Sequence, residues 1–153
     1  MKRARKSAGL SSNNLRLSQV RESFQKQGVM KLLGGRIAKL GHGIVEITAR
    51  NSPAFSQQDG FVHAGIMATL ADNAAGYATL STLPPGSRVL AVEFKLNFTR
   101  PAVGDMLRGR GRVRRLGRTL SVCEVEVEAR QKGKWTSCAW GSETVYCIRE
   151  KAT

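Results

Sequence analysis

The pattern of apolar and polar positions predicts a short amphipathic helix near the start of the chain. This helix covers Leu15 to Gln27 and places Val20 and Phe24 on one face. Ser18 is its candidate N-cap, and Gly28 marks its predicted end.

Two apolar runs follow this helix, from Arg36 to Leu40 and from Ile44 to Ala49. The glycine-rich turn of residues 41–43 lies between them, and the three segments together predict a β-hairpin. The next segment, from Asn51 to Val62, is polar and contains proline and glycine, so we predict a loop there.

The stretch from Ala64 to Thr82 has the length of a helix and consists mostly of small residues. Between His63 and Ser87 the only charged residue is Asp72. A helix that is apolar on all sides is a buried helix, and its small side chains let neighbouring backbones approach closely. Its threonines, asparagine and aspartate are unfavourable in a bilayer, so we predict no membrane span.

The period of the pattern changes to two after the Pro-Pro-Gly turn at 84–86. A strand is predicted whose apolar positions alternate with other residues, at Leu90, Val92, Phe94, Leu96 and Phe98. Three more strands are predicted at 106–116, 119–131 and 135–148. The elements predict an α+β fold with one mostly antiparallel sheet wrapped around one long central helix. We expect a single domain over residues 15–150.

The 153 residues carry 25 lysines and arginines against 11 acids, a formal net charge of +14. Residues 1–14 are predicted to form a flexible basic tail without the apolar region of a secretory signal. No helix-turn-helix, zinc-finger or RNA-binding signature accompanies the charge, so we predict no specific nucleic-acid partner. Two histidines and three scattered cysteines predict no metal site and a reducing compartment, the cytoplasm.

Asp72 is the first candidate for a catalytic residue. An ionised carboxylate in an apolar helix is costly, and no lysine or arginine lies within a turn to pair with it. Proteins usually retain such a group for chemistry. The start of the same helix is a second candidate, because the amides of Ala64 and Gly65 have no partner within the helix and can hold an oxyanion. Gln57 and His63 supply polar side chains beside it.

These two candidate groups cannot act on one carbonyl within a single chain. Asp72 lies eight residues beyond Ala64, which corresponds to about 12 Å along a helix axis. The carboxylate would have to come from a second subunit across a two-fold axis. We therefore expect an isologous dimer as the minimal active unit.

One motif unites these residues, Gln57-x5-His63-Ala64-Gly65-x6-Asp72, and it is followed by the strand Val89 to Phe98 and by Arg100-Pro101-Ala102. This arrangement resembles the hotdog-fold acyl-CoA thioesterases of the PaaI-like (phenylacetate-degradation) subgroup. The resemblance extends from about Arg21 to Tyr146. It implies a hotdog fold and hydrolysis of an acyl-CoA, with an aromatic or medium-chain acyl group, to the free acid and coenzyme A.

The resemblance also implies a role for each site residue. Asp72 would attack the thioester carbonyl as a nucleophile or activate a water as a general base. The amide of Ala64, with that of Gly65, would polarise the carbonyl oxygen. Gln57 would position the carbonyl or the water, and His63 would shape the entrance. The resemblance further implies sites at a dimer interface, a homodimer or homotetramer, and no cofactor beyond the coenzyme A of the substrate.

Four arginines alternate along one face of the predicted strand between Leu107 and Arg114. They form either a solvated outer face or, in part, a contact for the phosphates of coenzyme A. The candidates for phosphate contacts are Arg100, Arg112, Arg114 and Arg115.

One departure from the family pattern leaves other functions open. Relatives often carry serine or threonine near Gly76 or Ala91 to hold the attacking water, and neither position has a hydroxyl here. This favours a first alternative, a non-catalytic acyl-CoA-binding regulatory module. A second alternative is an acyl-CoA hydratase or dehydratase on the same fold. That chemistry requires a histidine paired with a carboxylate, and His63 and Asp72 are far apart within one chain.

Overall fold

The structure is a computed structural model that describes residues 12–149. Two helices, α1 (Ser12–Lys26) and α2 (Gly28–Leu32), come first and are followed by β1 (Arg36–Gly41), β2 (Ile44–Arg50), the 3-10 helix η1 (Pro53–Phe55), α3 (Ala64–Leu80), β3 (Arg88–Phe98), β4 (Met106–Leu116), β5 (Leu120–Gln131) and β6 (Lys134–Ile148). The first eleven residues of the predicted basic tail lie outside the described residues.

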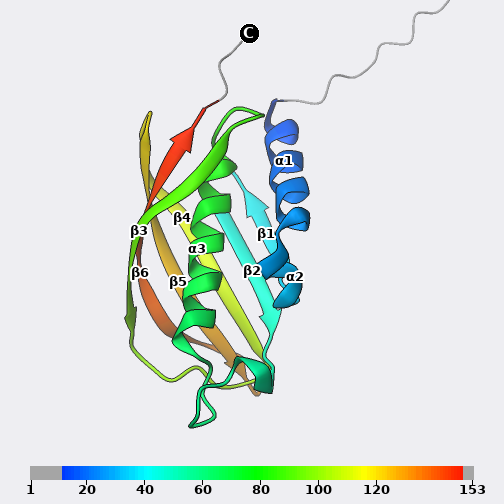
Figure 1. Cartoon of the computed structure of the whole chain (residues 1–153), viewed down its shortest axis with the longest axis vertical. Coiled ribbons are helices and arrows are strands. Elements are labelled where there is room, and N and C mark those ends of the chain that lie inside the picture. The colour runs from blue at the N-terminus through cyan, green and yellow to red at the C-terminus, as the bar shows by residue number, and fades with distance from the viewer. Residues whose placement is uncertain (1–11, 150–153) are drawn as a thin grey trace, which may run out of the picture.

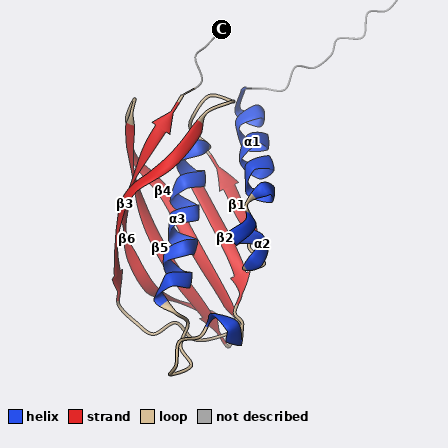
Figure 2. Ribbon diagram, viewed as in Figure 1, coloured by secondary structure: helices blue, strands red, loops and turns tan. Residues whose placement is uncertain are grey.

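The six strands form one antiparallel sheet in the order β1-β2-β4-β5-β6-β3. The long helix α3 lies across one face of this sheet, and α1 and α2 run beside it over the β1–β2 side (Figures 1 and 2). The predicted α+β architecture, a sheet wrapped around one long helix after a short N-terminal helix, is confirmed.

Glycines of β4 let α3 lie directly on the sheet. A Cβ atom added at Gly109 would come within 2.6 Å of the Leu70 carbonyl oxygen, and one at Gly111 would collide with that of Ala74. Any side chain at these positions would push the helix off the sheet. Among residues 12–149, no helix is both long and apolar enough to cross a membrane.

The N-terminal helical region differs from the prediction. The helix α1 begins by Ser12, and Ser18 lies within it, where its hydroxyl donates to Glu22 at 2.9 Å rather than capping an end. The first helix does end close to Gly28, at Lys26, but a second short helix, α2, begins at Gly28 after one extended residue. The buried side chain of Met30 anchors α2 to the core, an interaction that local sequence does not reveal.

The edge strand β3 exposes apolar side chains on both of its faces. Leu90 is 59% exposed, Val92 57% and Phe94 48%. The ladder with β6 shifts between Ala91 and Glu93, so a bulge interrupts the predicted alternation. The prediction that Leu90 and Phe94 share one apolar face is therefore wrong. The extra residue of the bulge places the side chains of Leu90 and Phe94 on opposite faces of the sheet. Exposed edge strands of this length are normally covered.

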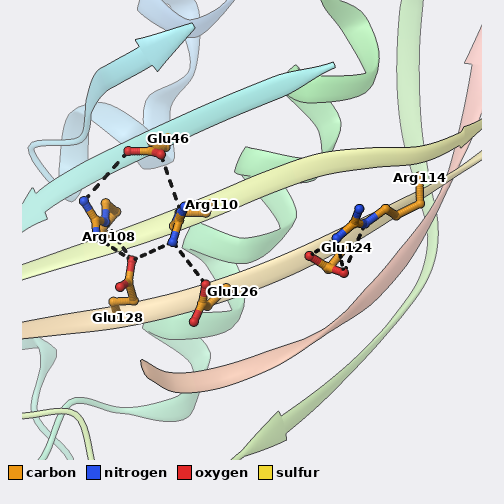
Figure 3. Close-up of polar contacts among 7 residues, drawn as sticks. All are labelled: Glu46, Arg108, Arg110, Arg114, Glu124, Glu126 and Glu128. Carbon is orange, nitrogen blue, oxygen red and sulfur yellow. Dashed lines mark hydrogen bonds and ion pairs between the residues drawn. The ribbon is translucent and has the colours of Figure 1, made fainter. Parts of the chain in front are cut away.

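The outer face of the sheet, opposite α3, carries a network of charged pairs (Figure 3). Arginines of β4 pair there with glutamates of both neighbouring strands, in a connected group of Glu46, Arg108, Arg110, Glu126 and Glu128 and in a separate pair of Arg114 and Glu124. Arg108 donates to Glu128 at 2.7 Å, and Arg114 holds Glu124 through two of its nitrogens. Much of the arginine charge on this face is therefore balanced locally.

Candidate active site

His63 caps the start of α3 and accepts a hydrogen bond from one of its first backbone amides. Its Nδ1 accepts a hydrogen bond from the Gly65 amide at 2.9 Å. An accepting Nδ1 leaves the ring proton on Nε2. The Ala64 amide is the first of the helix and has no carbonyl in a preceding turn to bind. Of the two predicted oxyanion donors, Ala64 is thus the one that remains available.

Gln57 lies in the loop that packs against this helix start. Its backbone amide donates to the carbonyl of Phe61 at 2.8 Å, and its side-chain oxygen accepts from the amide of Asp59. The loop is joined to the helix start by the amide of His63, which donates to Phe55 at 2.7 Å. The side-chain oxygen of Gln57 therefore serves its own turn, and its Nε2 is the atom left to contact a ligand.

Asp72 lies half-buried in the middle of α3, on the wall of a cavity of about 530 Å³ between α1, α3 and β3. Asn73 and Gln27 also line this cavity, and their buried side-chain oxygens have no hydrogen-bond partner within the described part of the chain. Burial raises the pKa of the Asp72 carboxyl above its usual range. A carboxyl with a raised pKa on the wall of a polar cavity is suited to accept a proton.

The structure does not bring all predicted site residues together within one chain. Gln57, His63, Ala64 and Gly65 gather at the start of α3. Asp72 lies eight residues further along the helix, about 12 Å away along its axis. The separation expected from the sequence is therefore present in the fold.

The four arginines proposed for coenzyme A lie in two places. Arg100 directly follows β3, and nearby Ala102 accepts a hydrogen bond from Val62 at 3.2 Å, so Arg100 lies at the end of the molecule that holds the start of α3. Arg112, Arg114 and Arg115 are exposed on β4. Arg112 and Arg114 lie on the outer face of the sheet, away from Asp72.

A second carboxyl, Glu143, is buried in the sheet beneath α3. Only 1% of this residue is exposed, and neither of its side-chain oxygens has a hydrogen-bond partner among the described residues. Burial, and secondly the negative charge of Asp72, raise the pKa of Glu143 from 4.5 to about 9. Glu143 therefore holds a proton at neutral pH.

With this geometry established, the family can be identified from known proteins. The model of the thioesterase superfamily matches residues 59–136. A provisionally named esterase of Saccharolobus solfataricus is 30% identical over 135 residues, which are 86% of this chain and 92% of that protein. The chain belongs to the thioesterase superfamily.

Solved structures agree with this membership. A thioesterase family protein from Silicibacter pomeroyi has a TM-score of 0.86 and 39% identity, covering 88% of this chain and 99% of that one. The PaaI protein of the phenylacetic acid degradation operon of E. coli has the same fold, with a TM-score of 0.81 and 23% identity over 94% of this chain and 100% of that one. The predicted hotdog fold is thus confirmed, and this member of the thioesterase superfamily is a thioester hydrolase.

Two features of this thioesterase were missed by sequence reasoning. Glu143 falls on the inward positions of β6, between Gly141 and Val145, and an acid in such an apolar alternation is a signal that the sequence does contain. Gln19 and Ser23 of α1, and Gln27 directly after its end, line the Asp72 cavity. They follow one another at intervals of four residues, so they form a polar stripe along one side of α1 and its end. Only the packing of α1 beside α3 shows where that stripe points.

Replacing Glu143 with glutamine is expected to stabilise the thioesterase increasingly as the pH rises. The folded protein binds a proton on Glu143 up to about pH 9, whereas the unfolded chain loses it near its ordinary value of 4.5. Between pH 4.5 and about pH 9 the folded protein binds one proton more than the unfolded chain. The free energy of unfolding of the wild type therefore falls as the pH rises in this range, by at most about 1.4 kcal/mol per pH unit. Glutamine cannot ionise and avoids this loss.

Urea unfolding of both proteins at about pH 6 and about pH 8.5 measures the effect. The matched control, Glu93→Gln, removes an exposed acid of the neighbouring strand β3. Its stability difference from the wild type is expected to stay constant. A constant difference for Glu143→Gln as well would show that Glu143 is already ionised in the folded protein.

Proposed function

We propose that this protein hydrolyses the thioester of an acyl-CoA in an active site shared between two copies of the chain. The observation that carries the proposal is the position of Asp72, a half-buried carboxyl on the wall of a cavity in an otherwise uncharged helix. Membership of the thioesterase superfamily supports the reaction type. The aromatic or medium-chain acyl groups implied by the sequence resemblance are the proposed substrates.

The exposed edge of the sheet supports the second copy. β3 is the last strand of the sheet and presents Leu90, Val92, Phe94 and Phe98 to solvent in the isolated chain. Pairing of this edge with its own copy about a two-fold axis would cover these side chains and extend the sheet. It would also place two α3 helices side by side in opposite directions, so that Asp72 of each faces the helix start of the other.

In the proposed reaction the thioester oxygen accepts a hydrogen bond from the Ala64 amide at the positive end of the α3 dipole. A water molecule attacks the thioester carbon through its oxygen, and Asp72 of the other copy takes the proton that this water loses. The carbon–sulfur bond then breaks, and Asp72 returns the proton to the departing thiolate of coenzyme A. The products are the free acid and the thiol, and the step requires no cofactor. The raised pKa of Asp72 supports the role of general base.

The cavity beside Asp72 is the proposed site of the acyl group. Its volume of about 530 Å³ lies within the range of small-molecule sites, roughly 300–1,000 Å³. Apolar contacts come from Leu80, Val89 and Leu90, and polar ones from the side chains of α1. For the phosphates of coenzyme A we propose Arg100, because it lies at the same end of the chain as the Ala64 amide.

The proposed compartment is the cytoplasm. All three cysteines, Cys123, Cys138 and Cys147, are free and buried. Burial raises the pKa of Cys123 to about 11, so this thiol is not reactive at neutral pH. Buried free thiols of this kind are typical of a reducing environment.

The direct test is a panel of aromatic and straight-chain acyl-CoA thioesters, with release of free thiol as the readout. We expect turnover of at least one class. Tight binding of acyl-CoA without thiol release from any member would overturn the proposal and favour the regulatory module. Release of thiol with formation of an anhydride on Asp72, detected by transfer of 18O from labelled water into the enzyme in a single turnover, would overturn the general-base role alone.

Replacing Val92 with glutamate is expected to produce a monomer with little thioesterase activity. The side chain is 57% exposed in the isolated chain, so the fold should tolerate the change, whereas a buried charge at a paired edge would not be tolerated. Sedimentation and thiol release at equal protein concentration measure both effects. Val29→Glu on α2, where the valine is 39% exposed, is the matched control. A Val92→Glu protein that remains dimeric would show that β3 is not the interface.

A further inference from the structure

We propose that Glu143 is a positioning residue for Asp72: Glu143 holds a proton and donates a hydrogen bond to the Asp72 carboxylate through one bridging water. This inference rests on the proposed function, since it assigns Glu143 a task only if Asp72 accepts a proton in the reaction. No part of the recognised motif contains Glu143, which is 71 residues beyond Asp72 in the chain.

The strand register places Glu143 under the turn of α3 that carries Asp72. Glu143 of β6 lies directly opposite Cys123 of β5. The Cys123 sulfur contacts the Ala75 carbonyl oxygen at 3.5 Å and the Thr79 hydroxyl at 3.2 Å, both on α3. Ala75 is one turn from Asp72, so the helix surface that meets Cys123 continues toward the Asp72 side chain. Figure 1 shows α3 lying over the strands of the sheet.

The burial of Glu143 requires a reason. A carboxyl that is 1% exposed, with both oxygens lacking a hydrogen-bond partner in residues 12–149, costs stability that a leucine or methionine would not. Its neighbours on the inward face of β6 are Gly141 and Val145, so this face is otherwise apolar around it. Unpartnered buried carboxyls of this kind are retained where they act on a neighbouring group.

The charged and titratable groups around Glu143 indicate which group that is. From α3 the carboxyl of Asp72 acts on it and raises its pKa. From β5 it faces Cys123, whose pKa of about 11 keeps the thiol neutral. From β3 the directly opposite residue is Phe94, and Glu93 lies on the other face, bonded to Thr144. Asp72 is therefore the negatively charged group that can accept a hydrogen bond from the protonated Glu143.

Such a pair divides one proton between two unlike carboxyls. The deeper group, Glu143, keeps the proton, and the group on the cavity wall, Asp72, stays ionised and oriented toward the cavity. A donated hydrogen bond favours the ionised form of Asp72 and offsets the opposite effect of its own burial. The pair thereby keeps a half-buried base ready to accept a proton at neutral pH.

The test compares Glu143→Leu with Glu143→Gln in the full-length enzyme, with the best acyl-CoA of the panel. Leucine removes the donor, and we expect kcat to fall about ten- to a hundredfold, the loss of one hydrogen bond to a charged group, with little change in KM. The acidic limb of the pH profile of kcat for Glu143→Leu should move to higher pH, because Asp72 ionises less readily without the donated hydrogen bond. Glutamine keeps an N–H donor and should recover most of the loss. The glutamine variant should also lack any fall in activity near pH 9 that comes from ionisation of Glu143.

Val145→Ala is the control, since Val145 lies on the same inward face of β6 and is fully buried. It should lower stability without moving the acidic limb. A Glu143→Leu enzyme that folds and keeps both the kcat and the acidic limb of the wild type would overturn the positioning role. If instead Asp72→Asn proves fully active, the proposed function fails first. In that case the infrared carbonyl band of a protonated carboxylic acid, present at neutral pH and absent in Glu143→Gln, still reports on the proton held by Glu143.

Discussion

Asp72→Asn is expected to lower kcat by about a thousandfold, within the 10²–10⁴ range that a positioned general base contributes. Asparagine has the shape of aspartate and can still hold a water, but it cannot take up the proton that the water must lose. KM should change little, because Asp72 contributes to the cavity wall through atoms that asparagine preserves. The folded protein should be slightly more stable, since burial disfavours the ionised form of Asp72.

The measurement is thiol release under saturating acyl-CoA, with circular dichroism to show that the fold is intact. Asp105→Asn is the matched control, because Asp105 is exposed and pairs with Arg130 in a loop outside the cavity. Its activity should remain within a few-fold of that of the wild type. An Asp72→Asn enzyme as active as Asp105→Asn would remove Asp72 from the mechanism and would leave the cavity as a binding site only.

The fold was predictable wherever local periodicity and tertiary packing favour the same helix or strand. The strands β4 to β6 were predicted within a few residues because each keeps one face on the core, and the helix α3 because its sequence is apolar on all sides. The bulge in β3 was not predictable, because its apolar positions alternate without interruption in the sequence and only the pairing with β6 reveals the extra residue. Helix α2 was missed because five residues are too few to show a period, and the buried side chain of Met30 holds it in place.

The candidate site was predictable in its chain-local parts and not in its long-range parts. The cap of α3 by His63 follows from residues two apart, and the isolation of Asp72 follows from the composition of a single helix. The approach of Glu143 to Asp72 depends on the register of β6 against β5 and on the helix that covers both. The burial alternation of β6 places Glu143 inward, a signal that sequence reasoning missed, and only the fold shows which group Glu143 meets.

Ala64→Pro is expected to reduce kcat by about a hundred- to a thousandfold, the usual effect of removing one oxyanion donor. Proline has no amide N–H but is favoured at the first position of a helix. The backbone can accept it, because His63 has φ −60° and ψ 137°, the extended conformation that precedes proline. Ala64→Ser retains the N–H and should keep most of the activity. Equal activity of the two variants would show that the Ala64 amide does not hold the oxyanion.

Mixing Asp72→Asn with Ala64→Pro subunits tests whether the two groups act across the two-fold axis. In a mixed dimer one site receives both substitutions and the other receives neither, so unfolding the two proteins together and refolding them should restore roughly a quarter of wild-type activity for random pairing. The restoration requires that Asp72 of one chain works with Ala64 of the other. Within a single chain the two lie about 12 Å apart along α3, and a site contained in one chain would gain nothing from mixing. Activity that stays at the level of the separate variants, in dimers shown by mass spectrometry to be mixed, would therefore contradict the shared site.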